Sequence, residues 1–113
     1  MNHVFAGIGV SDLAGAREWW ERLVGRPPDL IPNDNEFCWQ LTESGWIYLI
    51  GDRRRAGKGL VTVLVDDLDA EIAGMAERGI EAGEVRDLPG LVRSTTVTDP
   101  DGNEIQFAQP ASS

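Results

Sequence analysis

Apolar residues at the start of the chain alternate with other residues and then change to a helical spacing. In residues 4–10 every second residue is Val, Ala or Ile, which predicts a strand with one buried face. Over residues 13–24 the apolar positions recur every three or four residues. This spacing predicts a helix that begins after Ser11 or Asp12 and ends at Gly25. Three shorter extended segments are predicted near 28–32, 36–41 and 46–50.

The same succession of patterns returns in the second half of the chain. Residues 60–65 predict a strand, and Asp66 or Asp67 then begins a helix that ends at Gly79. Residues 99–103, Asp-Pro-Asp-Gly-Asn, predict a tight turn, because proline fixes one backbone angle and glycine supplies conformational freedom. The remaining strands are predicted near 80–86, 92–98 and 104–108.

The two halves of the chain align with each other at an offset of 55 residues. This offset places the apolar stripe of 4–10 on that of 60–65, and Asp12-Leu13 on Asp67-Leu68. Each half reads as one strand, one helix and three strands, or βαβββ, and a chance match is the weaker explanation. We predict a single domain with module one over about 3–51, module two over about 59–108 and a tail over 109–113.

Composition narrows the classes of function. The 113 residues are enough for one hydrophobic core, and 42% of them are hydrophobic, as in ordinary globular proteins. The formal charge of −9 repels phosphate backbones and anionic lipid heads, so we expect neither a nucleic-acid nor a membrane partner. A single cysteine, Cys38, and the lack of a long apolar run predict a cytoplasmic protein.

Several short motifs together resemble those of one known superfamily. They are Val-Ser-Asp-Leu at 10–13, Trp-Trp followed by Leu-Val-Gly within 19–25, Val-Asp-Asp-Leu-Asp-Ala at 65–70 and Asp-Pro-Asp-Gly-Asn-Glu-Ile at 99–105. With the duplicated βαβββ pattern, the chain resembles the vicinal oxygen chelate superfamily of glyoxalases, bleomycin resistance proteins and extradiol dioxygenases. The resemblance implies an α+β fold, in which the two modules form a curled mixed sheet around a central cavity with the helices on the outer faces.

Enzymes of this superfamily hold a divalent metal with one side chain from each of four strands. The resemblance places these four positions at Phe5, Tyr48, Leu60 and Gln106. Phenylalanine and leucine have no lone pair to donate, and a neutral glutamine is a poor ligand. We therefore expect neither a metal site nor any other cofactor, and the metal-dependent lyase or dioxygenase activity of the superfamily is not expected either.

Two residues are weak candidates for acid–base catalysis. His3 is the only histidine, and it lies two residues before Phe5, so in an extended strand the two side chains would point to the same side. A histidine so near a terminus is more often a solvated surface residue. Glu104 lies two residues before Gln106, so in a strand its carboxylate would point to the same side as Gln106. It also follows directly after a turn, and an exposed carboxylate is the simpler interpretation there.

Aromatic residues provide the most informative candidate for binding. Phe5, Trp46 and Tyr48, together with Phe37 and Trp39, are predicted to line one concave surface, beside which glycines at 7 and 9 leave space. The alternative is a solid aromatic core. The predicted ligand-binding residues are Phe5, Trp39, Trp46, Tyr48, Leu60 and Gln106.

Two functions are consistent with this sequence. The first is a metal-free, homodimeric protein of the bleomycin-resistance type that binds a small aromatic or cationic molecule, because aromatic faces attract both π-systems and cations. The alternative is a metal-independent isomerase, cyclase or lyase of the same superfamily that acts on a small metabolite. The sequence alone does not choose between them, and it does not identify the ligand or the dimer arrangement.

Overall fold

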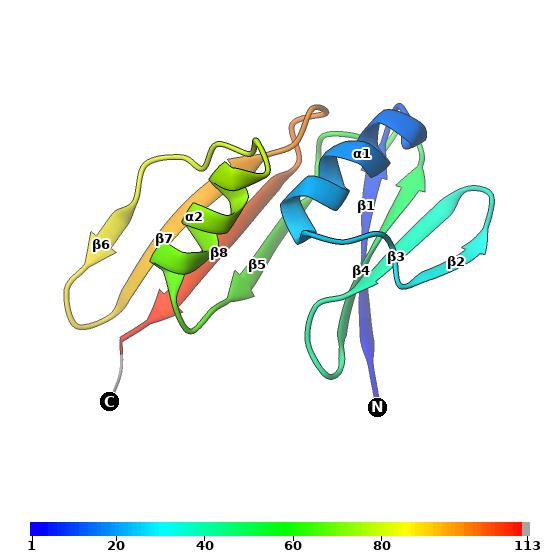
Figure 1. The fold of residues 1–113 in the computed structure, drawn as a ribbon. Coiled ribbons are helices and arrows are strands. Elements are labelled where there is room, and N and C mark those ends of the chain that lie inside the picture. The colour runs from blue at the N-terminus through cyan, green and yellow to red at the C-terminus, as the bar shows by residue number, and fades with distance from the viewer. Residues whose placement is uncertain (112–113) are drawn as a thin grey trace.

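The computed structural model describes residues 1–111 as two four-stranded sheets and two helices (Figure 1). The predicted α+β fold of two βαβββ modules is confirmed, although the two sheets do not close into a barrel. In chain order the elements are β1 (Val4–Val10), α1 (Leu13–Val24), β2 (Leu30–Asn33), β3 (Glu36–Gln40), β4 (Gly45–Gly51), β5 (Leu60–Leu64), α2 (Leu68–Glu77), β6 (Arg86–Leu88), β7 (Val92–Thr98) and β8 (Glu104–Pro110).

Both sheets have the same topology, which confirms the internal repeat. The first has the strand order β1-β4-β3-β2 and the second has the order β5-β8-β7-β6. In each sheet the first strand pairs in parallel with the last strand of its module, and the other pairs are antiparallel. Parallel pairing needs a long crossover connection, and in each module the helix is part of it.

The helix ends follow the local signals in the sequence. The side chain of Asp12 accepts a hydrogen bond from the backbone N–H of Gly15, and Asp67 accepts one from Ala70. Gly25 ends α1 in the left-handed conformation with φ of 93°. Neither helix within residues 1–111 has the length and apolarity needed to cross a membrane.

The prediction of a strand near 80–86 is wrong for every residue of this segment except Arg86. Only Arg86–Leu88 form a strand, and residues 80–85 are irregular. Ile80 is buried in the core directly after α2. The N–H of Gly83 donates to the carbonyl oxygen of Thr96, and its carbonyl oxygen accepts from the hydroxyl of Thr95. Burial of Ile80 therefore decides the path of this segment, and a strand begins only where the chain reaches the edge of β7.

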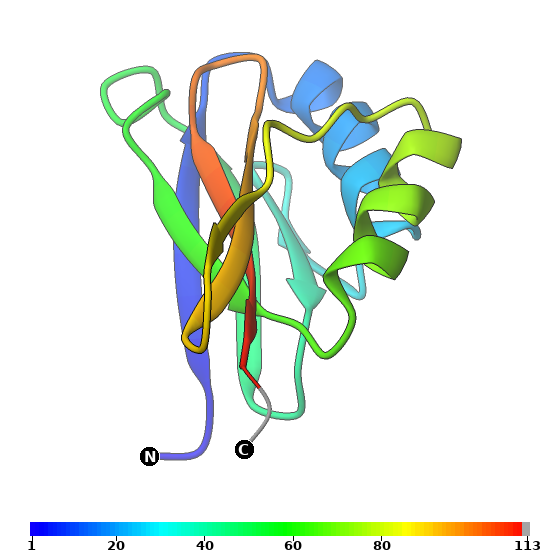
Figure 2. The same ribbon diagram turned by 90° about the vertical axis from the view of Figure 1, so that its left-hand side faces the viewer.

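Both helices lie on the same side of the two sheets (Figure 2). One continuous core fills the space between the helices and the sheets, and it contains residues from both modules. The indole of Trp20 lies at its centre, 6.4 Å from that of Trp39. Within residues 1–111, no helix covers the opposite faces of the two sheets.

The turn at 99–103 joins the second module to the first through hydrogen bonds of buried side chains. Asn103 is fully buried; its side-chain amide donates to the carbonyl oxygen of Gly9 (2.9 Å), and its side-chain oxygen accepts from the backbone N–H of Gly59 (2.7 Å). The buried carboxylate of Asp99 accepts hydrogen bonds from the amide of Asn103 and from Nε1 of Trp20. The Asp-Pro-Asp-Gly-Asn motif is therefore a structural joint between modules as well as a turn.

Candidate functional site

Three aromatic rings share the face of the first sheet that lies opposite the helices. Phe5 on β1 pairs with Trp46 on β4, and their rings stack with centroids 5.0 Å apart and planes 15° from parallel. Two residues further along the same strands, Gly7 pairs with Tyr48. Because residues two apart in a strand point to the same side, Phe5, Trp46 and Tyr48 form one aromatic cluster on this open face.

Gly7 and Gly9 give this face its shape. A Cβ atom at Gly7 would lie 2.6 Å from the hydroxyl of Tyr48, so the phenol ring lies directly over the β1 backbone. A Cβ atom at Gly9 would lie 2.7 Å from that of Arg55, because the segment between the modules packs onto β1 there. The result is a shallow hollow of about 230 Å³ lined by Gly7, Gly9, Tyr48, Ile50, Arg55, Lys58 and Gly59.

The open face of the second sheet is more polar. Leu60 on β5 pairs with Glu104 on β8, and Thr62 pairs with Gln106 through a side-chain hydrogen bond of 3.1 Å. Glu104 and Gln106 also line a hollow of about 310 Å³, whose other walls are polar side chains of β7 and the segment before it. An aromatic face and a polar face therefore lie on the same side of the molecule.

Trp39 and Phe37 do not belong to the aromatic cluster, so the prediction of one five-ring surface is wrong for these two residues. Trp39 pairs with Ile47, which points into the core, and its side chain is 0% exposed. The guanidinium of Arg17 on α1 lies over the ring of Phe37, 4.7 Å from its centroid. The sequence predicts that Phe37 and Trp39 point to the same side of β3. Which side of the sheet that is depends on the register in which β3 pairs with β4.

In a single copy of the chain, two of the predicted ligand-binding residues are exposed. Phe5 is 46% exposed and Leu60 is 73% exposed. Large apolar side chains at this level of exposure on one face are typical of a surface that binds another molecule. The open face is therefore the candidate site.

Comparison with known proteins identifies the family. The sequence model of the Glyoxalase/Bleomycin resistance protein/Dioxygenase superfamily matches residues 1–107. The chain belongs to this superfamily. A glyoxalase/bleomycin resistance protein from Catenulispora acidiphila DSM 44928 is 37% identical, with a TM-score of 0.93 over 98% of this chain and 100% of that one. No curated protein matches the sequence.

More distant relatives share the superfamily fold. TnmS3, an antibiotic-binding protein from Streptomyces sp. CB03234, is 24% identical, with a TM-score of 0.77 over 98% of both chains. A glyoxalase-related enzyme from Clostridium phytofermentans is 15% identical, with a TM-score of 0.76 over 98% of this chain and 96% of that one. At these identities the likeness concerns the fold alone.

The residues at the superfamily's metal-ligand positions do not fit a metal ion. Phe5 and Leu60 carry no donor atom, and the side-chain oxygen of Gln106 accepts the hydrogen bond from Thr62. Tyr48 lies on the open face as expected, over Gly7. Among residues 1–111, no three His, Cys, Asp or Glu side chains come together in a way that could hold a metal.

The two candidate acid–base residues lie on different sheets. His3, just before β1, is exposed, and its Nδ1 accepts a long hydrogen bond of 3.4 Å from Nε1 of Trp46. Glu104 is an exposed residue at the start of β8. His3 therefore lies beside the aromatic cluster, whereas Glu104 belongs to the polar hollow.

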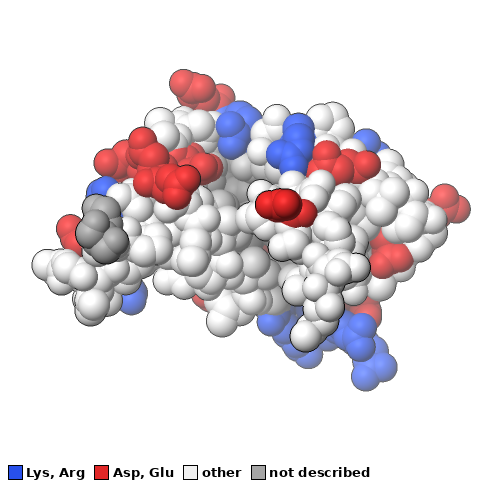
Figure 3. Space-filling view, turned by 90° about the horizontal axis from the view of Figure 1, so that it is seen from below, with Lys and Arg blue, Asp and Glu red and all other residues white. Residues whose placement is uncertain are grey.

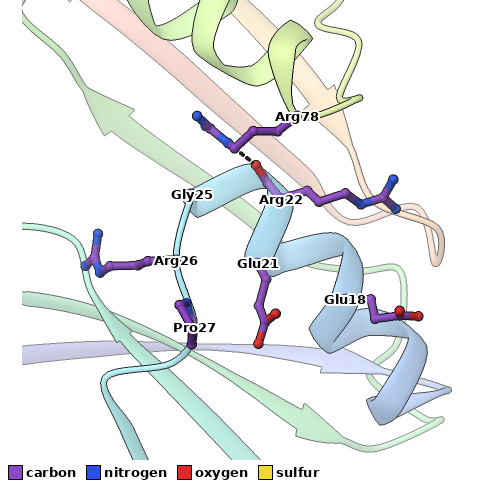
Figure 4. Close-up of a pocket in the computed structure, with 7 residues that line it drawn as sticks. All are labelled: Glu18, Glu21, Arg22, Gly25, Arg26, Pro27 and Arg78. Atoms are coloured by element: carbon purple, nitrogen blue, oxygen red, sulfur yellow. Dashed lines mark hydrogen bonds between the residues drawn. The ribbon is translucent and has the colours of Figure 1, made fainter.

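A further hollow, of about 600 Å³, lies where the C-terminal ends of the two helices meet (Figure 4). The guanidinium of Arg78, which follows α2, donates to the carbonyl oxygens of Arg22 and Leu23 at the end of α1. In Figure 4 the side chains of Arg22, Glu21 and Arg26 point in different directions, so they do not converge on one ligand. Arg78 stabilises the free carbonyl groups at the end of α1 and joins the two helices.

Cys38 is expected to be an unreactive thiol in the folded protein. Its side chain is buried on β3, and burial, with a smaller effect of the Glu36 carboxylate, raises the pKa of the thiol. A raised pKa lowers the fraction of reactive thiolate at any given pH. In mildly alkaline buffer, the thiol reagent DTNB should modify Cys38 slowly in the native protein and at the ordinary rate in denaturant. Rapid modification of the native protein would contradict this placement.

Proposed function

We propose that this chain is a metal-free binding protein that holds a small aromatic or cationic molecule against the open face. The observation that carries the proposal is the cluster of Phe5, Trp46 and Tyr48 on a face without a covering helix. Flat rings bind by stacking on such a cluster, and cations bind to the electron-rich ring faces. Leu60 and Gln106 on the second sheet would complete the site.

Two further facts support this choice of ligand class. The net charge of −9 raises the local concentration of cations around the protein. TnmS3, a relative with the same fold, is an antibiotic-binding protein. The proposed ligand is therefore a compound that combines a planar ring system with a positive charge.

We also propose that the functional unit is a homodimer in the cytoplasm. Phe5 and Leu60 are too exposed in one copy to enclose a ligand, and a second copy would cover them. A single buried cysteine fits a reducing compartment. The net charge of −9 supports a positively charged small molecule as a partner, rather than nucleic acid or a membrane.

Tryptophan fluorescence tests the proposed site. We expect a panel of cationic aromatic antibiotics to include compounds that quench the fluorescence saturably, because Trp46 lies on the open face. The quenching that arises from the open face should be lost in Trp46→Phe and retained in Trp19→Phe, a matched variant on α1 on the other side of the sheet. It should be unchanged by EDTA.

Two outcomes would contradict the proposal. One is a panel without any saturable quenching, and the other is equal quenching in the Trp46→Phe and wild-type proteins.

The polar hollow with Glu104 favours the alternative function, a metal-independent isomerase, cyclase or lyase. A bound compound that is recovered chemically changed from the wild-type protein, but unchanged from Glu104→Gln, would support that alternative.

A further inference from the structure

A second hollow lies between the two modules on the helix side, away from the aromatic cluster. It has a volume of about 360 Å³, within the range of small-molecule sites. Figure 3 shows the molecule hollowed between its two halves in the view from below. Its walls include apolar residues of both modules, among them Trp20, Leu23, Ile47, Val63, Ile105 and Phe107. We call it the inter-module groove.

The groove reaches the core but is open to solvent. Trp20, Ile47 and Ile105 at its floor are almost completely buried, whereas Val24, Leu41 and Val63 along its walls are only partly buried. An apolar molecule that entered the groove would therefore remove apolar surface of these walls from water.

Three charged residues line the groove. The positive charge of Arg26 is already compensated, because its guanidinium is 3.1 Å from the carboxylate of Asp29 and also donates to the carbonyl oxygen of Gln40. Asp66 and Glu71 are exposed and take part in no ion pair within residues 1–111. The uncompensated charge at the groove is therefore negative.

We infer that the inter-module groove is a second binding site, for a small planar organic cation. The apolar walls contact the ring system, and Asp66 and Glu71 at the border attract the positive charge. This site shares no residue with the aromatic cluster. Binding in the groove can therefore be followed at residues that do not belong to the cluster.

Occupation of the groove would also link the two modules. Val63 and Phe107 come from the second module, whereas Trp20 and Ile47 come from the first. A ligand that contacts both walls in the folded state, and neither in the unfolded state, stabilises the folded arrangement of the two modules.

Amide-resolved NMR with proflavine, a planar three-ring cation, tests the inference. We expect saturable shifts of the amide signals of residues 23–24 and 41–42, which line the groove and do not belong to the open face. The double variant Asp66→Asn/Glu71→Gln should bind proflavine about tenfold more weakly, because two attractive charges are removed. The control Asp34→Asn/Glu77→Gln changes the net charge equally at exposed sites outside the groove and should bind like the wild type.

Three results would overturn the inference. The first is a set of shifts confined to residues 5–7 on the open face, which would support the proposed function alone. The second is equal weakening in the two double variants, because that would show attraction to the overall charge only. The third is a groove covered by a second copy of the chain, shown by signals of residues 23–24 and 41–42 that move on dilution without ligand.

Discussion

Replacing Asn103 by alanine should lower the free energy of unfolding by about 3 kcal/mol. The substitution leaves the carbonyl oxygen of Gly9 and the backbone N–H of Gly59 without the partner that satisfies them in the native protein. Each buried polar group that loses its partner costs about 1–3 kcal/mol. Urea unfolding followed by tryptophan fluorescence measures the change, since Trp20 reports on the core.

Asn35 provides the matched control. It is also an asparagine whose side chain donates to a backbone carbonyl oxygen, that of Gly51, but it is exposed. The Asn35→Ala variant should therefore lose less than about 1 kcal/mol. Equal losses in the two variants would show that the buried hydrogen bonds of Asn103 do not stabilise the contact between the modules.

The double variant Phe5→Asp/Leu60→Asp should weaken the proposed homodimer about a hundredfold or more. Both side chains are exposed in a single copy, so the substitutions cost little in the stability of the monomer. In a dimer that covers the open face, each copy would instead bury two unpaired carboxylates. Sedimentation velocity over a range of concentrations measures the change in dissociation constant.

The control for this experiment adds the same two charges on the opposite side of the molecule. Ala14 on α1 and Ala73 on α2 are exposed, and the variant Ala14→Asp/Ala73→Asp should dimerise like the wild type. A wild-type protein that stays monomeric at its highest soluble concentration would contradict the proposed dimer. Equal weakening by both double variants would show that general charge repulsion, and not cover of the open face, is responsible.

The sequence predicts the parts of the fold that local signals determine. The alternation in β1 and the caps at Asp12 and Asp67 are properties of neighbouring residues, and the structure confirms all three. The segment over 80–86 was mispredicted because burial of Ile80 against the core outweighs its strand propensity. That burial depends on residues distant in the sequence.

The candidate site was predictable only in part, for the same reason. Phe5, Trp46 and Tyr48 share a face because β1 and β4 pair in a register that their alternation allows. Trp39 has a similar pattern, but its pairing with Ile47 directs it into the core. The inter-module groove was missed altogether, because its walls come from elements of both modules that are distant in the sequence.

The proposed function requires that the open face itself binds the small molecule, without a metal. The most direct test is a crystal structure of the chain grown in EDTA with a compound that quenches Trp46. We expect the ring system of the compound to stack against Phe5, Trp46 or Tyr48, with a second copy covering it. A compound bound elsewhere on the protein, with these three rings free of contact, would contradict the claim.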